Sequence, residues 1–85
     1  MTVTIFSTTT CPYCKLLKDY LKGNQIAFTE KLIDTDEMAQ KEMAVISNGF
    51  LGVPFTTIVD NSGNMQTVLG FDRGKLDDIF ELQNL

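Results

Sequence analysis

Both cysteines of this 85-residue chain lie in one short stretch, FSTTTCPYCK, two residues apart. Thiols at this spacing can bind a metal, form a structural disulfide or exchange disulfides with a substrate. A structural zinc site needs four cysteine or histidine ligands. The chain has two cysteines, Cys11 and Cys14, and no histidine, so the sequence predicts no zinc site within one chain. A structural bridge across so small a loop would stabilise little. A redox-active pair is the leading hypothesis.

The composition of the chain excludes several other functions. The formal net charge is −4 and no run is rich in lysine or arginine, which argues against a nucleic-acid partner. No apolar stretch approaches the roughly 20 residues that span a bilayer, and the N-terminus lacks the pattern of a signal peptide. We therefore expect no membrane association and a cytoplasmic location, where structural disulfides are rare. The length predicts a single domain over residues 1–85.

The hydrophobic pattern predicts the elements that position the two cysteines. Residues 2–6 are β-branched and apolar, which indicates a strand, and Pro12 suits the first turn of a helix that Gly23 and Asn24 end. Alternation over residues 26–32, with Ile26, Phe28, Glu30 and Leu32 on one side, predicts a second strand. The inner face of the first helix is expected to carry Leu16, Leu17, Tyr20 and Leu21.

A second helix is expected to follow this strand. Asp34 and Glu37 resemble a capping box at its start, and the pair Asn48 and Gly49 offers a left-handed end. Met38 and Met43 lie at helical spacing, so we interpret them as core residues rather than as a binding surface.

The last third of the chain predicts a hairpin and a final helix. A proline-containing strand over residues 50–60, the turn DNSGN and the strand MQTVL form the hairpin. Asp72 is expected to cap a helix whose inner face carries Leu76, Ile79 and Phe80. The order β-α-β-α-β-β-α, with a right-handed first crossover, predicts an α/β domain with a four-stranded mixed sheet and three helices on its two faces.

The expected start of the first helix gives the two thiols different roles. Only a thiolate attacks a disulfide, and the unpaired N–H groups at a helix N-terminus favour an anion at Cys11. The backbone amides of Tyr13 and Cys14 are the expected donors to its sulfur, and Lys15 adds positive charge. Cys14 should be more buried, and would resolve the mixed disulfide that Cys11 forms with a substrate.

Three further residues are candidates for shaping a cleft around the thiols. Pro12 limits flexibility between them and withholds one N–H group. Tyr13 is expected either to line the cleft beside the sulfur or to be an exposed helix residue. Pro54 either begins a strand or, with a cis peptide bond, makes Val53 present its backbone to an extended peptide or glutathione.

With TTTCPYC, GVP and GFD at these elements, the whole chain resembles the glutaredoxins, small members of the thioredoxin-fold superfamily. The resemblance implies a thioredoxin-like fold, Cys11 as nucleophile and Cys14 as resolving thiol in a reversible disulfide. It also implies glutathione as co-substrate with no tightly bound cofactor, its cysteine portion bound by the Val53 backbone beside a cis Pro54. The γ-glutamyl end would be held by Gly70, Phe71 and Asp72.

Two departures from the glutaredoxin pattern bear on the source of electrons. Glutaredoxins usually carry a lysine where this chain has Thr8, and Leu69 replaces the first glycine of a Gly-Gly pair. Arg73 or Lys41 could supply the missing charge. The GFD stretch also resembles the glutaredoxin-like hydrogen donors of ribonucleotide reductase, which thioredoxin reductase typically recharges. We expect a monomeric enzyme that reduces protein disulfides or glutathione mixed disulfides, with ribonucleotide reductase as an alternative partner.

Two functions of other classes stay open from the sequence. Some glutaredoxins bridge a [2Fe–2S] cluster between two monomers through the first cysteine and glutathione, although Pro12 argues against that behaviour here. A redox-inactive binding module is the other alternative. Iron in the purified protein would support the first, and a Cys11 that reacts like an ordinary thiol would support the second.

Overall fold

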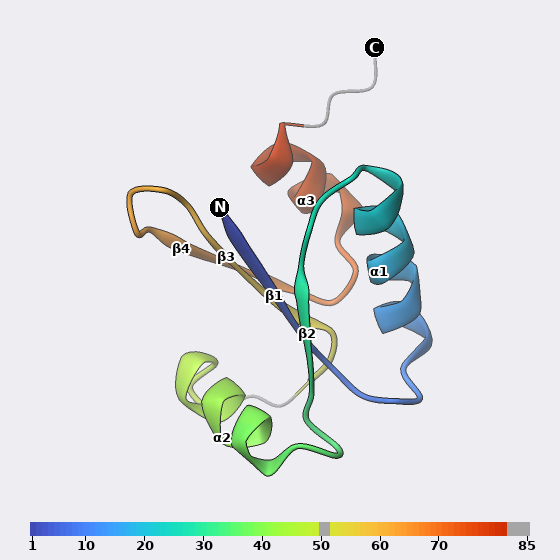
Figure 1. The fold of residues 1–85 in the computed structure, drawn as a ribbon, viewed down its shortest axis with the longest axis vertical. Helices are drawn as coiled ribbons and strands as arrows, with labels where there is room; N and C mark the ends of the chain where they lie inside the picture. The colour runs from blue at the N-terminus through green and yellow to red at the C-terminus, as the bar shows by residue number, and fades with distance from the viewer. Residues whose placement is uncertain (50–51, 82–85) are drawn as a thin grey trace.

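The computed structural model describes residues 1–49 and 52–81, and Figure 1 shows their arrangement. In this part of the chain four strands form one sheet in the order β2-β1-β3-β4. β1 pairs with β2 in parallel, whereas the β1–β3 and β3–β4 pairs are antiparallel. The predicted element order and mixed sheet are confirmed. The elements are β1 (Thr2–Ser7), α1 (Pro12–Gly23), β2 (Thr29–Leu32), α2 (Glu37–Ile46), β3 (Phe55–Val59), β4 (Met65–Leu69) and α3 (Arg73–Phe80).

Helices cover both faces of the sheet, α1 and α3 on one face and α2 on the other (Figure 1). Successive residues of a strand point to opposite faces, so Ile5 and Phe6 of β1 enter different cores. The core under α1 and α3 consists of Val3, Ile5, Leu17, Leu21, Ile58, Val68 and Leu76. The core under α2 consists of Phe6, Ile33, Ala39, Met43 and Phe55.

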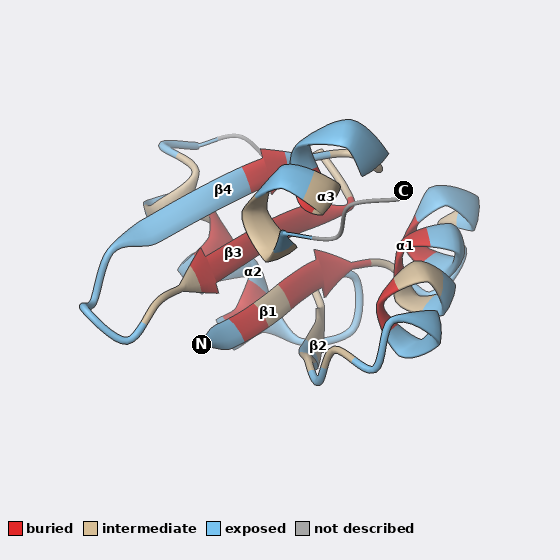
Figure 2. Ribbon diagram, turned by 90° about the horizontal axis from the view of Figure 1, so that it is seen from above, coloured by how far each residue is buried: buried red, intermediate tan, exposed pale blue. Residues whose placement is uncertain are grey.

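The two central strands, β1 and β3, contain most of the buried residues of the sheet, whereas β4 is exposed along most of its length (Figure 2). Val68 is the buried residue of β4. β3 begins at Phe55, directly after Pro54, because a proline has no N–H group to donate to a ladder. The start of the predicted third strand, Phe50 and Leu51, lies outside the described residues.

The start of α2 differs from the prediction. Its N-cap is Asp36, whose carboxylate accepts the N–H groups of Met38 and Ala39. Asp34 instead accepts the backbone N–H and the hydroxyl of Thr9, at 3.0 and 2.7 Å. The predicted capping box at Asp34 was therefore wrong, because a tertiary contact to the loop after β1 engages that carboxylate. At α3, the predicted cap is confirmed, since Asp72 accepts the Lys75 N–H group.

Two residues predicted for the core are exposed. Met38 is 72% exposed in the first turn of α2, and Leu16 is 48% exposed on α1, because each helix contacts the sheet through a narrower stripe than the sequence suggested. Met43 is buried, as predicted. β2 is shorter than the predicted strand over 26–32, and Ile26 and Phe28 pack against the core from the loop before it.

Candidate active site

Cys11 lies at the N-terminus of α1, where a loop of three threonines joins that helix to β1. It is the N-cap residue, with an extended backbone (φ −87°, ψ 112°), and the Cys14 N–H group donates to its Sγ over 3.2 Å. This contact satisfies one of the N–H groups that every helix start leaves unpaired, and it favours negative charge on the sulfur. The other predicted donor, the Tyr13 N–H group, makes no hydrogen bond to Cys11 in the described part of the chain.

The two thiols differ in exposure and in ionisation. Both are free, with Cys11 partly exposed and Cys14 only 1% exposed, so the predicted difference in burial is confirmed. Burial raises the pKa of the Cys14 thiol to about 12, and the hydrogen bond with Cys11 and the charge of Glu30 act in the same direction. A backbone hydrogen bond from Thr8 acts in the opposite direction. Cys14 is therefore protonated at neutral pH.

A second loop meets the active-site end of the sheet through a cis peptide bond between Val53 and Pro54. Phe55, the next residue, pairs with Phe6 near the end of β1, so this loop and the Cys11 loop lie at the same end of the sheet. Within the described residues, the Val53 backbone has no hydrogen-bond partner, which leaves its N–H and C=O groups free for a ligand.

Residues 70–72, which were predicted to belong to a glutathione site, are hydrogen-bonded to this second loop. The Gly70 N–H group donates to the Pro54 carbonyl over 2.7 Å, and Gly70 has a left-handed backbone (φ 73°) that favours glycine. Phe71 packs edge-on against Tyr20 of α1, with ring centres 5.8 Å apart, and Asp72 is the N-cap of α3. In the described part of the chain, no hydrogen bond connects these residues to Cys11.

Pro12 and Tyr13 lie on the surface at the start of α1, and Tyr13 is 62% exposed. This exposure fits both predicted alternatives, so a role for Tyr13 beside the Cys11 sulfur stays a prediction. Its free surface stays available to a substrate that approaches Cys11, and the exposed Leu16, one turn further along α1, extends that apolar surface.

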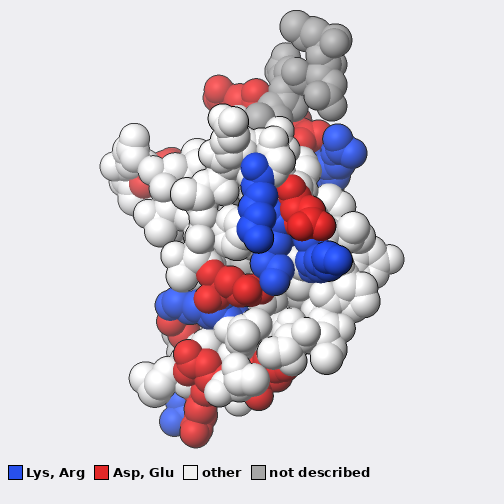
Figure 3. All heavy atoms as spheres, turned by 45° about the vertical axis from the view of Figure 1, so that its right-hand side comes forward, with Lys and Arg blue, Asp and Glu red and all other residues white. Residues whose placement is uncertain are grey.

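The cations considered as replacements for the missing lysine at Thr8 have other partners. Lys41 pairs with Glu37 on α2, at 3.5 Å, and Arg73 lies 6.0 Å from the centre of the Tyr20 ring. Neither makes a contact with Thr8 among the described residues. Lys and Arg side chains gather instead on the side of α1, with acidic side chains among them (Figure 3).

Comparison with known proteins assigns the family. The sequence model described as glutaredoxin matches residues 3–61. This chain belongs to the glutaredoxin family. A glutaredoxin-like 8.6 kDa protein in the rubredoxin operon of Clostridium pasteurianum is 34% identical over 79 residues, which cover 93% of this chain and 97% of that protein. The glutaredoxin-like protein NrdH of Lactococcus lactis subsp. cremoris is 38% identical over 55 residues, which cover 65% of this chain and 74% of that protein.

A solved structure supports the thioredoxin-like fold of this glutaredoxin. The glutaredoxin-like protein NrdH-redoxin from Escherichia coli superposes with a TM-score of 0.69, over 100% of this chain and 99% of that one, at 22% identity. At this identity the likeness establishes the fold alone.

This glutaredoxin also contains a polar cluster under α1 that sequence reasoning missed. The Ser7 hydroxyl donates to Oε2 of Glu30 over 2.7 Å, and Lys18 Nζ lies 2.9 Å from the same oxygen. Ser7 is fully buried. The signal was present in the second strand, where Glu30 occupies an apolar side of the alternating pattern, because an acid at such a position needs a partner.

Away from the cysteines, the described residues of this glutaredoxin form a cavity but no metal-binding cluster. A cavity of about 200 Å³ lies at the beginning of β1, whereas Cys11 follows the end of that strand. Within residues 1–49 and 52–81, no three His, Cys, Asp or Glu side chains are placed to hold a metal ion. No helix in the same ranges is long and apolar enough to cross a membrane. The cavity is lined by Met1, Thr2, Val3, Ala27, Phe28 and Thr29.

Proposed function

We propose that this glutaredoxin reduces protein disulfides and glutathione mixed disulfides through a reversible bond between Cys11 and Cys14. The observation that carries the proposal is the difference between the two sulfurs. Cys11 is accessible and accepts an N–H group at a helix N-terminus, whereas Cys14 is buried and protonated. The Cys11 sulfur can therefore attack a substrate, while the Cys14 sulfur, in the same helical turn, stays protonated.

The exchange proceeds in two displacement steps. The Cys11 thiolate attacks one sulfur of the substrate disulfide, forms a mixed disulfide and expels the other sulfur as a thiolate, which takes up a proton from solvent. Cys14 then loses its proton to solvent and attacks the Cys11 sulfur, which forms the Cys11–Cys14 disulfide and releases the second substrate thiol. Two electrons pass from the dithiol to the substrate, and a reductant must return them.

We infer that glutathione is this reductant. An extended glutathione could pair with the free N–H and C=O groups of Val53 as a short added strand. The Gly70–Pro54 hydrogen bond brings the N-terminus of α3 to the same place, where the amides of Phe71 and Asp72 could bind a carboxylate. The contacts at both ends of the expected ligand thus belong to one continuous surface.

A second candidate reductant is thioredoxin reductase, with ribonucleotide reductase as the enzyme served. Two observations favour it: Thr8 offers no charge to a glutathione carboxylate, and an exposed Leu69 stands where glutaredoxins usually have a glycine. The similar protein from Lactococcus lactis is named NrdH, and the NrdH-redoxin from Escherichia coli is described as having a thioredoxin-like activity profile.

A coupled assay separates the two reductants. A protein disulfide serves as acceptor, and NADPH consumption is followed with glutathione plus glutathione reductase or with thioredoxin reductase alone. Turnover with glutathione is the expected result. Turnover with thioredoxin reductase only would replace glutathione by the second candidate. Absence of turnover with both, while the purified protein contains free thiols, would overturn disulfide exchange itself.

A further inference from the structure

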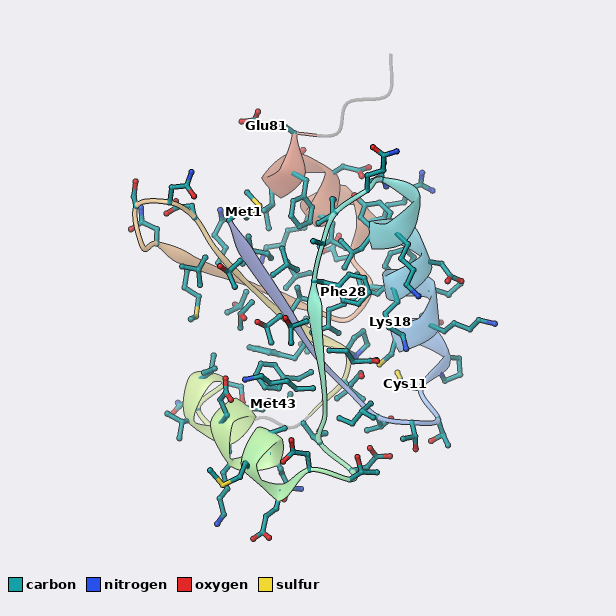
Figure 4. The ribbon with its side chains drawn as sticks, viewed as in Figure 1. Met1, Cys11, Lys18, Phe28, Met43 and Glu81 are labelled. Carbon is teal, nitrogen blue, oxygen red and sulfur yellow. The ribbon has the colours of Figure 1, made fainter. Side chains whose placement is uncertain are left out.

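The side chain of Glu30 lies beneath the helix that carries Cys14. Glu30 pairs with Ile5 in the β1–β2 ladder, so its side chain points to the face that α1 covers, and Ser7 points the same way two residues further along β1. Lys18 is four residues after Cys14, on the next turn of the same side of α1. Figure 4 shows the Lys18 side chain between α1 and β2.

Ser7 and Lys18 hold Glu30 ionised and in place. Burial pushes its pKa upward, but the hydrogen bonds from Ser7 and Lys18 outweigh burial, and the pKa lies below its usual value. In the described part of the chain, the charged groups that act on Cys14 are Cys11 and Glu30, and those that act on Glu30 are Lys18 and Lys22. A negative charge therefore lies on the face of the sheet that α1 covers and acts on the Cys14 thiol, and Lys18 partly neutralises it.

We propose that Glu30 and Lys18 are positioning residues with opposite effects on Cys14: Glu30 holds its sulfur as a thiol, and Lys18 limits that effect. The inference rests on the proposed exchange reaction. In that reaction Cys11 attacks as a thiolate, and Glu30 adds a second negative charge that disfavours a thiolate at Cys14. Formation of the mixed disulfide removes the charge of Cys11, so Cys14 can then release its proton to solvent and attack.

The test measures the ionisation of Cys14 directly in a Cys11→Ser background. Cys14 is then the sole thiol, and residue 11 is uncharged, as Cys11 is in the mixed disulfide. Alkylation by iodoacetamide is followed as a function of pH, because the rate below the pKa is proportional to the thiolate fraction. We expect Glu30→Gln to accelerate alkylation by about two- to fivefold and Lys18→Met to slow it by about twofold.

The opposite signs distinguish this role from a structural one. If the pair only secured α1 to β2, either substitution would loosen the same contact and expose Cys14, so both rates would rise. Glu42→Gln is the matched control. It removes the ion pair between Glu42 of α2 and Lys31, which follows Glu30 in β2. The rate of Cys14 alkylation should be unchanged in this variant. Equal rates in all variants, or changes of the same sign, would overturn the proposal. Alkylation needs no turnover, so this result is independent of the coupled assay.

Discussion

Glu30 and Lys31 are neighbours in β2, and each forms an ion pair with a helix on a different face of the sheet. Glu30 meets Lys18 of α1 at 2.9 Å, and Lys31 meets Glu42 of α2 at 2.7 Å. The chemistry and lengths of the two pairs are similar, but their surroundings differ. The first pair adjoins the buried Ser7 hydroxyl and lies beneath the helix of Cys14, whereas in the second Lys31 lies 5.9 Å from the centre of the Phe6 ring.

This difference indicates that the two faces have separate tasks. The face under α1 and α3 combines its apolar core with buried polar groups, including Ser7, Thr56 and the Cys14 thiol. The core under α2 is aromatic and aliphatic, with the Phe6 and Phe55 ring centres 6.3 Å apart, and one buried hydroxyl residue, Thr57, lies on this face. We call the face under α1 and α3 the chemical face and the face under α2 the packing face. Because alternate residues of a strand point to opposite faces, β1 contributes residues to both.

The largest effect expected on the chemical face comes from Cys11→Ser. The variant should lose measurable disulfide reduction, because no thiolate remains to attack, while its free energy of unfolding changes by less than about 0.5 kcal/mol, since Cys11 is a partly exposed residue. NADPH consumption in the coupled assay and urea denaturation measure the two quantities. Reduction at the wild-type rate would mean that Cys11 is not the nucleophile.

On the packing face, Met43→Ala should act on stability alone. Removal of this fully buried side chain is expected to cost about 2–5 kcal/mol of unfolding free energy, from lost apolar contacts and the cavity left behind. Urea denaturation measures the loss, and alkylation of Cys11 in the folded variant should proceed at the wild-type rate. A change in Cys11 reactivity at temperatures where the variant is folded would show that the two faces are not separate.

Thr56→Val tests the polar character of the chemical face. Within the described residues, the buried Thr56 hydroxyl has no hydrogen-bond partner, so its replacement by a methyl group of similar shape should stabilise the fold by about 1 kcal/mol. Thr67→Val, at an exposed site of β4, is the control and should be close to neutral. Destabilisation by Thr56→Val would indicate that this hydroxyl has a partner in solution.

The smallest expected effect is on the acid dependence of stability. The pKa of Glu30 is lower in the folded chain than its usual value, so its contribution is present above the unfolded pKa and is lost as the pH falls through the folded pKa. Glu30→Gln should therefore flatten the fall of unfolding free energy in the acid range, as measured by denaturation at a series of pH values. An unchanged acid profile would contradict the ionised, hydrogen-bonded state of Glu30.

Features specified by short stretches of sequence were predicted well. The turn DNSGN and the strand MQTVL have the predicted limits, and Asp72 caps α3, because turns and caps depend on residues only a few positions apart. The predictions for Asp34, Met38 and Leu16 were wrong. The sequence contains two acids able to cap α2, and only the distant Thr9 decides that Asp34 is engaged elsewhere.

The sequence by itself determined that the two thiols are unequal. Pro12 and the helix that follows place Cys11 before the first turn and Cys14 within it, and the amide that reaches the Cys11 sulfur comes from only three residues away. The tertiary structure decided how unequal they are. Cys14 is buried, Glu30 lies under the helix that carries it, and Gly70 donates a hydrogen bond to Pro54. Each of these features depends on segments far apart in the chain. Such contacts exist only once the sheet has brought those segments together.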